Sequence, residues 1–256
     1  MSVMKATGIT IKEFEHYNKE NFIYCRKFDG SRTLFKDGRL VSDNRDGFKN
    51  ERYNHITQAL KNFDGILDGE LWVKQDRVTE LAKKENWKEA VFIVFDILEI
   101  DGTNLRNKTL KERRAILETL NFQHPIYITE QYKNLNEAWK RANEGSWEGL
   151  IAKDIRSPYL EKRSPYWLKL KRYNEAVVTI DSLEQTNTQL HGTFICSDEV
   201  LNDIRVGSLS TKYVDDYLKA KEKGKVVKAE IQYLNKTNTG YYFQPTLKRL
   251  LIEVVK

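Results

Sequence analysis

The chain has 256 residues, of which 40% are hydrophobic and 31% charged, a composition typical of soluble globular proteins. Its 43 Lys and Arg against 37 Asp and Glu give a net charge of +6, which permits a polyanionic partner without requiring one. The sequence shows neither a membrane-spanning apolar run nor a signal peptide, so we expect no membrane association and no secretion. Cys25 and Cys196 are too few for a disulfide framework or a zinc site, which indicates a reducing compartment.

In chain order, alternating and continuous apolar residues first predict strands. We expect them over residues 22–28, 32–43, 65–73 and 90–100, with Asp37-Gly38 as a hairpin turn in the second segment. The last of these segments is apolar enough to be buried on both faces of a sheet.

Helical spacing of apolar residues then predicts helices over residues 110–120 and 135–145, the second ending at Gly145. Residues 149–154 and 166–173 again have the pattern of strands.

The pattern changes after Asn174 to short strands, predicted over residues 176–183, 192–197, 203–209, 226–234 and 247–255. One helix, residues 211–223, interrupts them and ends at Gly224. Five short strands with one helix favour a small β-barrel of the OB type. The domain boundary is therefore expected near Arg172 to Glu175, which gives domains over residues 1–173 and 174–256.

Several short charged patterns follow one another in a fixed order. Each is weak alone, because Asp-Gly pairs are common turns and alternating lysines are common on exposed strands. Together, in this order and ahead of an OB-like tail, they form a specific combination. The patterns are Lys27-Phe28-Asp29-Gly30-Ser31-Arg32, Arg45, Asp68-Gly69-Glu70-Leu71, Phe95-Asp96, Glu148-Gly149-Leu150-Ile151-Ala152-Lys153 and Trp167-Leu168-Lys169-Leu170-Lys171.

On these motifs the chain resembles the covalent nucleotidyltransferases, and among them the small ATP-dependent DNA ligases of viral or accessory bacterial type. The likeness covers nearly the whole length and includes residues 191–235 in the tail. It implies an α+β fold, with a nucleotidyltransferase domain of ATP-grasp-like antiparallel sheets and helices followed by a C-terminal OB-fold barrel. It also implies nick sealing through a lysyl-AMP and then a DNA-adenylate.

The resemblance makes Lys27 the nucleophile, with Asp29 orienting the amine or accepting its proton and Arg32 completing the turn. Taken alone, Lys27 would be interpreted as a surface lysine. A free lysine near pKa 10.4 is neutral about once in two thousand molecules at pH 7, which costs roughly 4–5 kcal/mol. Nearby cations and partial burial favour the neutral amine, so Arg32, a metal ion and the motif lysines are expected to lower that cost.

The same resemblance assigns roles to five further residues. Arg45 would contact nucleotide or nick phosphate, although its local pattern is looser than the family's. Glu70 would contact ribose and help hold metal, and Glu148 would be a second acidic group near the metal. Phe95 would stack on adenine or belong to the core, and Lys153 would reach the nucleotide phosphates.

Lys169 and Lys171 have period-two spacing, which puts both on one face of a strand together with Trp167. In the family such lysines bind the α-phosphate and stabilise the charge that develops during transfer.

The likeness weakens at the C-terminus, where family members carry an arginine-rich segment that orients pyrophosphate. Here the corresponding stretch offers Lys248, Arg249 and Lys256, and an ordinary closing strand is about as good an interpretation.

The expected cofactors are ATP and Mg²⁺ or another divalent cation, and the expected partner is nicked double-stranded DNA bound by a monomer in bacterial or virus-infected cytoplasm. An RNA ligase is the second interpretation, a capping guanylyltransferase the third and a non-enzymatic OB module the fourth. An NAD-dependent ligase is disfavoured, because only 26 residues precede Lys27 and zinc-binding cysteines are missing. The linker over residues 184–190 is too short to encircle a duplex, so DNA contacts should be mainly electrostatic.

Overall fold

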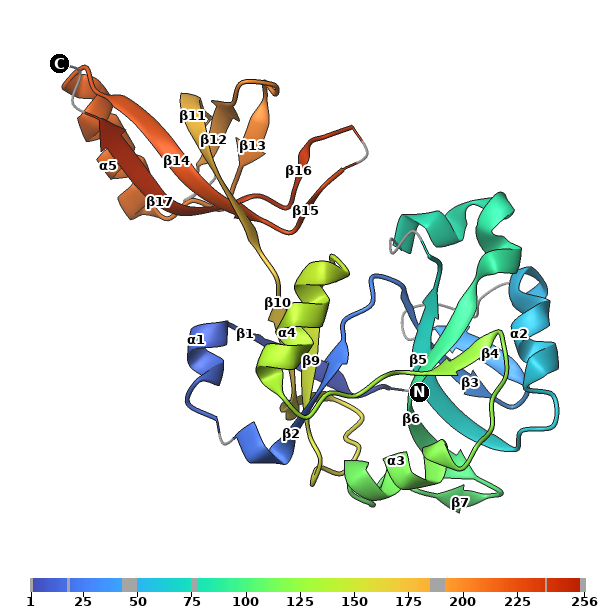
Figure 1. The fold of residues 1–256 in the computed structure, drawn as a ribbon. Coiled ribbons are helices and arrows are strands. Elements are labelled where there is room, and N and C mark those ends of the chain that lie inside the picture. The colour runs from blue at the N-terminus through green and yellow to red at the C-terminus, as the bar shows by residue number, and fades with distance from the viewer. Residues whose placement is uncertain are drawn as a thin grey trace. The chain divides into compact units, whose positions relative to one another are not determined.

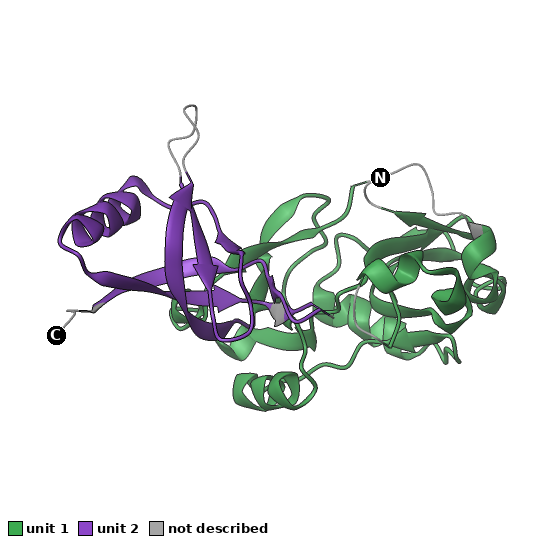
Figure 2. Cartoon of the chain, turned by 90° about the horizontal axis from the view of Figure 1, so that it is seen from above, with its two compact units in different colours: residues 1–171 green, residues 172–256 purple. Residues whose placement is uncertain are grey.

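The computed structural model describes residues 2–17, 19–42, 50–74, 78–184, 192–237 and 239–253. The chain divides into two compact units, residues 1–171 and 172–256 (Figure 2). The elements of unit 1 are, in order, β1 (Lys5–Ile9), α1 (Ile11–Phe14), η1 (Lys19–Asn21), β2 (Phe22–Arg26), β3 (Ser31–Lys36), β4 (Arg39–Ser42), η2 (Asn50–Tyr53), α2 (Asn54–Ala59), β5 (Gly65–Trp72), η3 (Val78–Ala82), η4 (Lys84–Glu89), β6 (Val91–Ile100), β7 (Thr103–Asn104), α3 (Leu110–Glu118), β8 (Ile126–Ile128), α4 (Leu135–Glu144), β9 (Gly149–Asp154) and β10 (Arg163–Lys171).

The first sheet of unit 1 has the strand order β1-β10-β9-β2. The strand β9 is antiparallel to both β2 and β10, whereas β1 joins the edge parallel to β10. The helix α4 lies over one face of this sheet (Figure 1). That face is apolar, and Leu150, Leu168 and Leu170 pack there with Ala138 and Ala142 of the helix. The opposite face is left for polar side chains.

The second sheet has the order β4-β3-β5-β6-β7, with β8 parallel to β6. Its apolar core includes Phe92 and Val94 of the ten-residue strand β6, which was expected to be buried on both faces. The helix α3 begins with a capping box, in which Thr109 and Glu112 satisfy each other's backbone N–H groups. This helix packs along β6 and contributes Arg113, whose side chain is fully buried.

Unit 2 forms a five-stranded sheet of order β13-β12-β11-β14-β17, with α5 between β13 and β14 in the chain. This is the strand and helix order of the OB fold. Phe194, Ile231 and Tyr217 are part of its core. Its elements are β11 (Asn174–Glu184), β12 (Thr193–Ser197), β13 (Ile204–Val206), α5 (Thr211–Glu222), β14 (Val226–Tyr233), β15 (Asn235–Lys236), β16 (Tyr242–Phe243) and β17 (Thr246–Glu253).

The predicted strands and the three predicted helices are all present, and the fold is α+β with mainly antiparallel sheets, as the sequence indicates. The sequence did not predict β1, β8 or the small β15–β16 hairpin, nor the parallel pairings of β1 and β8. None of the helices in the described ranges has both the length and the apolar character needed to cross a bilayer.

Candidate active site

The central strand β9 brings three of the sequence motifs together. In the register of the first sheet, Ile151 of β9 lies between Cys25 of β2 and Lys169 of β10. Two residues along, Gly149 pairs with Lys171, and its carbonyl accepts a hydrogen bond from the backbone N–H of Lys27. Because side chains alternate along a strand, the lysines of β10 share the polar face on which Lys27 begins the turn after β2.

The Lys27 amine contacts one carboxylate directly. Its Nζ donates a hydrogen bond to Oε2 of Glu148, and Lys171 Nζ lies 3.7 Å from Oε1 of the same group. The Glu148 side chain is 12% exposed, so this carboxylate joins two lysines in a largely buried position. Glu148 therefore fixes the nucleophile candidate beside one of the predicted phosphate-binding lysines.

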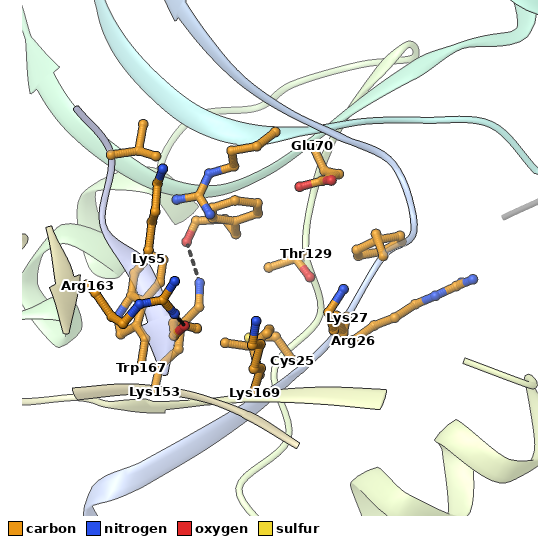
Figure 3. Close-up of a pocket in the computed structure, with 16 residues that line it drawn as sticks. Lys5, Cys25, Arg26, Lys27, Glu70, Thr129, Lys153, Arg163, Trp167 and Lys169 are labelled. Atoms are coloured by element: carbon orange, nitrogen blue, oxygen red, sulfur yellow. Dashed lines mark hydrogen bonds between the residues drawn. The ribbon is translucent and has the colours of Figure 1, made fainter. Parts of the chain in front are cut away.

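Lys169 lines the cavity into which Lys27 projects (Figure 3). Partial burial lowers the pKa of Lys169, and the neighbouring charges of Lys171 and Lys27 lower it further. The like charges that shift this pKa show that the three amines lie within each other's field, as an anion-binding site requires.

Arg32 and Glu70 face the cavity from the second sheet, where they are paired across β3 and β5. Arg32 holds Asp68 in a bidentate ion pair, with both nitrogen–oxygen distances 2.6 Å, and the Tyr159 hydroxyl donates to the same carboxylate at 2.6 Å. Despite the cost of burial, the ion pair with Asp68 raises the pKa of Arg32 above its usual value. Burial raises the pKa of Glu70 to about 7, against the attraction of Arg32 and Lys27.

The turn that carries Asp29 requires glycine at the next position. A Cβ on Gly30 would lie 2.2 Å from the carbonyl oxygen of Leu71 on β5, well inside contact distance. The turn after β2 thus lies directly against β5, which brings Lys27 and Arg32 to the same cavity.

Phe95 reaches the cavity through an irregularity of β6. The strand register shifts between Asp68, which pairs with Asp96, and Gly69, which pairs with Val94. Phe95 is therefore the extra residue of a β-bulge, a device that re-aims a side chain near functional sites. Its neighbour Asp96 accepts two hydrogen bonds of 2.8 Å from Arg113, which anchors the strand to α3.

Two cations already cover the Phe95 ring. Arg32 Cζ lies 4.4 Å and Lys153 Nζ 4.5 Å from the ring centroid. Lys153 Nζ also lies 4.0 Å from the ring centroid of Trp167 and 3.5 Å from the Phe95 carbonyl oxygen. Burial lowers the pKa of Lys153. In this arrangement the Lys153 amine lies against the rings of Phe95 and Trp167. A base stacked on Phe95 would have to displace Arg32 or Lys153 from that ring.

The cavity has a volume of about 340 Å³, within the range of small-molecule sites. Its wall includes four charged or hydroxyl-bearing residues to which the sequence assigned no role, namely Lys5, Arg26, Thr129 and Arg163. Lys5 pairs with Arg163 across the parallel β1–β10 contact, which leaves no local pattern in the sequence. The alternation of apolar and polar residues along a strand cannot reveal which distant strand it pairs with in parallel.

Two carboxylates are available for a divalent cation. Glu148 is among the charges that act on Glu70, so both belong to one electrostatic neighbourhood. Within the described part of the chain no three acidic, His or Cys side chains gather into a ligand cluster. This donor set fits Mg²⁺, which needs only one or two carboxylates beside substrate phosphates, and it does not fit a closed structural metal site.

Some predicted residues are not assembled in the cavity. Arg45 and Lys256 lie outside the described residues. On β17 of unit 2, Lys248 and Arg249 both contact Glu230, at 2.7 and 2.5 Å, and Lys248 also contacts Glu175 at 2.8 Å. Their positive charges are thus balanced within unit 2.

The match to a known protein family ends at the same residue as unit 1 of the structure. Residues 3–171 match the family model of the ATP dependent DNA ligase domain. The SPbeta prophage-derived DNA ligase-like protein LigB of Bacillus subtilis is 31% identical over 184 residues, which are 65% of this chain and 67% of that protein. DNA ligase 1 of Saccharomyces cerevisiae is 31% identical over 211 residues, 68% of this chain but 28% of the yeast protein. The match with the yeast enzyme therefore reaches only part of its length.

Among solved structures, one from a structure–function study of Lig E DNA ligases has a TM-score of 0.74 at 14% identity, and the match covers 98% of this chain and 99% of that chain. At this identity the likeness shows the fold. The matched family and the named relatives are DNA ligases, which favours DNA ligation over RNA ligation or capping.

Proposed function

Because the chain belongs to the ATP-dependent DNA ligase family, we propose that it seals nicks in duplex DNA with ATP, through an AMP carried on Lys27. The observation that carries this proposal is the position of the Lys27 amine, in a cavity of nucleotide size and beside Glu148, Lys169 and Lys171.

In the first step Lys27 Nζ attacks the α-phosphorus of ATP. A nitrogen–phosphorus bond forms, the bond to the bridging oxygen breaks, and pyrophosphate leaves with its electron pair. The amine must first lose a proton, and we assign its acceptance to Glu148, because this carboxylate accepts a hydrogen bond from Nζ. Lys169 and Lys171 would stabilise the charge on the α-phosphate oxygens.

In the second step the AMP moves from Lys27 to the 5′-phosphate at a nick, and in the third the neighbouring 3′-hydroxyl displaces it. In both steps negative charge again develops on phosphate oxygens in the transition state. The same lysines would therefore stabilise all three steps. Glu70 and Glu148 would hold Mg²⁺, which would screen the charge of the phosphates when bound. Asp29 would orient the amine from the turn that Gly30 fixes against β5.

For the base and sugar we propose the two remaining contacts. Phe95 would stack on adenine once Arg32 or Lys153 has moved from its ring, and Lys153 would then be free to turn toward the phosphates. Glu70 would accept a hydrogen bond from a ribose hydroxyl. Arg45 keeps its predicted role toward phosphate, since it lies outside the described residues.

Covalent labelling with α-labelled ATP tests the proposal. We expect label to remain on the denatured protein, to be lost in Lys27→Ala, and to persist in the control Lys36→Ala, whose side chain pairs with Asp37 on the hairpin of β3 and β4. Lys27→Ala should still seal part of a pre-adenylylated nick, because the amine is needed only in the first step. Loss of both activities in a folded variant would contradict the role of Lys27.

The same assay separates the other interpretations. Label from GTP in place of ATP would indicate a capping enzyme, and sealing of nicked RNA in preference to nicked DNA would indicate an RNA ligase. Retention of no label by the unmodified protein would leave only a nucleic-acid-binding module.

A further inference from the structure

Thr129 places an unused hydrogen-bonding group in the wall of the cavity. Its side chain is 3% exposed, and its hydroxyl has no hydrogen-bond partner among the described residues. A buried hydroxyl without a partner costs free energy, and native proteins rarely leave one unless a ligand or an ordered water completes it. The position of this hydroxyl therefore points to a ligand atom.

Backbone hydrogen bonds hold Thr129 in the seam between the two sheets. Its N–H donates to the carbonyl of Val94 at 2.8 Å, beside Phe95 on β6. Three residues later Tyr132 exchanges two hydrogen bonds of 2.9 Å with Tyr24 of β2, beside Cys25. The segment from 129 to 132 thus runs from one wall of the cavity to the other, and both its ends are fixed.

Figure 3 shows the Thr129 side chain between Glu70 and Lys27, among the residues that surround the cavity. Most polar side chains of this wall carry charge, which suits phosphate. Thr129 is the uncharged side chain among the described cavity residues that can both donate and accept a strong hydrogen bond, since the Cys25 thiol is weak and the Trp167 indole only donates. The hydrogen-bonding edge of a base is likewise an uncharged array of donors and acceptors.

We propose that the Thr129 hydroxyl binds the hydrogen-bonding edge of the adenine base, and so contributes to nucleotide selection. The inference rests on the proposed function, because it needs ATP in this cavity. A base stacked on Phe95 presents its edge, rather than its face, to groups beside the ring. Thr129 is such a group, because its backbone bonds to the residue next to Phe95. The hydroxyl would then gain in the complex a partner that no described residue supplies.

The test compares Thr129→Val with the unmodified protein, because valine has nearly the same shape without the hydroxyl. Nucleotidylation of Lys27 is followed by intact-protein mass at varied concentrations of ATP, of purine riboside triphosphate, which lacks the 6-amino group, and of 1-deaza-ATP, which lacks N1. We expect Thr129→Val to lower kcat/KM for ATP about three- to tenfold, the range for one uncharged hydrogen bond. The maximal rate should stay unchanged, and the loss should vanish with one of the analogues.

The matched control is Thr33→Val. Thr33 is also buried, but its hydroxyl donates to the Ser31 carbonyl at 2.9 Å. The control should lower Tm and leave kcat/KM for ATP unchanged, whereas Thr129→Val should leave Tm of the free protein equal or higher.

Three results would overturn the inference. They are an unchanged kcat/KM for ATP in Thr129→Val, an equal loss with all three nucleotides, or a fall in Tm, which would reveal a structural partner. If the unmodified protein formed no adduct with ATP, the proposed function would fail and this inference with it. If it formed one and Thr129→Val behaved identically, only the inference would fail.

Discussion

Glu70 should make the free protein less stable as pH rises through the neutral range. Burial raises the pKa of this carboxyl to about 7, whereas the pKa of a solvated glutamate is 4.5. The folded chain therefore prefers the protonated form more strongly than the unfolded chain does. The resulting stabilisation is complete below about pH 4.5 and is lost as pH rises through about 7.

The size of the effect follows from the two pKa values. A difference of about 2.5 between the folded and unfolded pKa values corresponds to roughly 3 kcal/mol in the free energy of unfolding. Glu70→Gln keeps the shape and removes the titration. The difference in the free energy of unfolding between the variant and the unmodified protein at pH 4 serves as the reference. At pH 8 the variant should have gained about 3 kcal/mol over the unmodified protein.

Urea denaturation in EDTA, followed by tryptophan fluorescence at several pH values, measures this difference. The fluorescence reports on unit 1, because the five tryptophans of the chain lie there, at Trp72, Trp87, Trp139, Trp147 and Trp167. Groups that do not interact with Glu70 titrate alike in both proteins, so the difference between the curves reports on Glu70 and the charges coupled to it, among them Arg32 and Lys27. Parallel pH profiles for the two proteins would refute the reasoning.

Three other predictions concern charge. Lys169→Ala and Lys171→Ala should each slow AMP transfer at least about tenfold in single-turnover assays, the scale of losing one charge-stabilising donor, and unchanged rates would make these lysines structural. Arg113→Met should lower the free energy of unfolding by about 3–5 kcal/mol, because Asp96 would remain buried without its ion-pair partner. A loss of less than about 1 kcal/mol in urea denaturation would contradict a stabilising role of this ion pair. Nick sealing should collapse by a few hundred millimolar salt while adenylylation changes little, and a parallel decline of the two steps would contradict electrostatic DNA binding.

The strands and the chemical groups of the site were accessible from the sequence for simple physical reasons. Period-two alternation places Lys169 and Lys171 on one face wherever their strand pairs. A Gly that follows Asp29 signals a turn, and the turn carries Lys27 and Arg32 to the same place. The register of β9 with its neighbouring strands brings these motifs together. This register depends on contacts between residues more than 100 positions apart in the sequence, such as Lys27 and Glu148.

The contacts that the sequence did not reveal are non-local or irregular. The parallel β1–β10 pairing, which puts Lys5 beside Arg163, has no turn signal to announce it. The bulge at Phe95 arises from a one-residue shift against β5, which a hydrophobic run cannot show. Thr129 follows a three-residue strand in an apolar context, where a threonine is ordinary. What distinguishes it is a hydroxyl in the cavity wall that has no hydrogen-bond partner among the described residues.

The pairing of charges also changes which cations act on the nucleophile. Arg32 was expected to lower the cost of deprotonating Lys27, but its guanidinium is bound on both arms by Asp68, so much of its field is cancelled. Lys171 likewise shares Glu148 with Lys27. Lys169 faces the cavity without an ion pair in the described part of the chain, and its pKa is lowered by burial and then by the charges of Lys171 and Lys27. Under the proposed function, Lys169 would therefore meet an entering α-phosphate without a carboxylate partner among the described residues, while Arg32 would act by holding Asp68 and the adjoining strands in place.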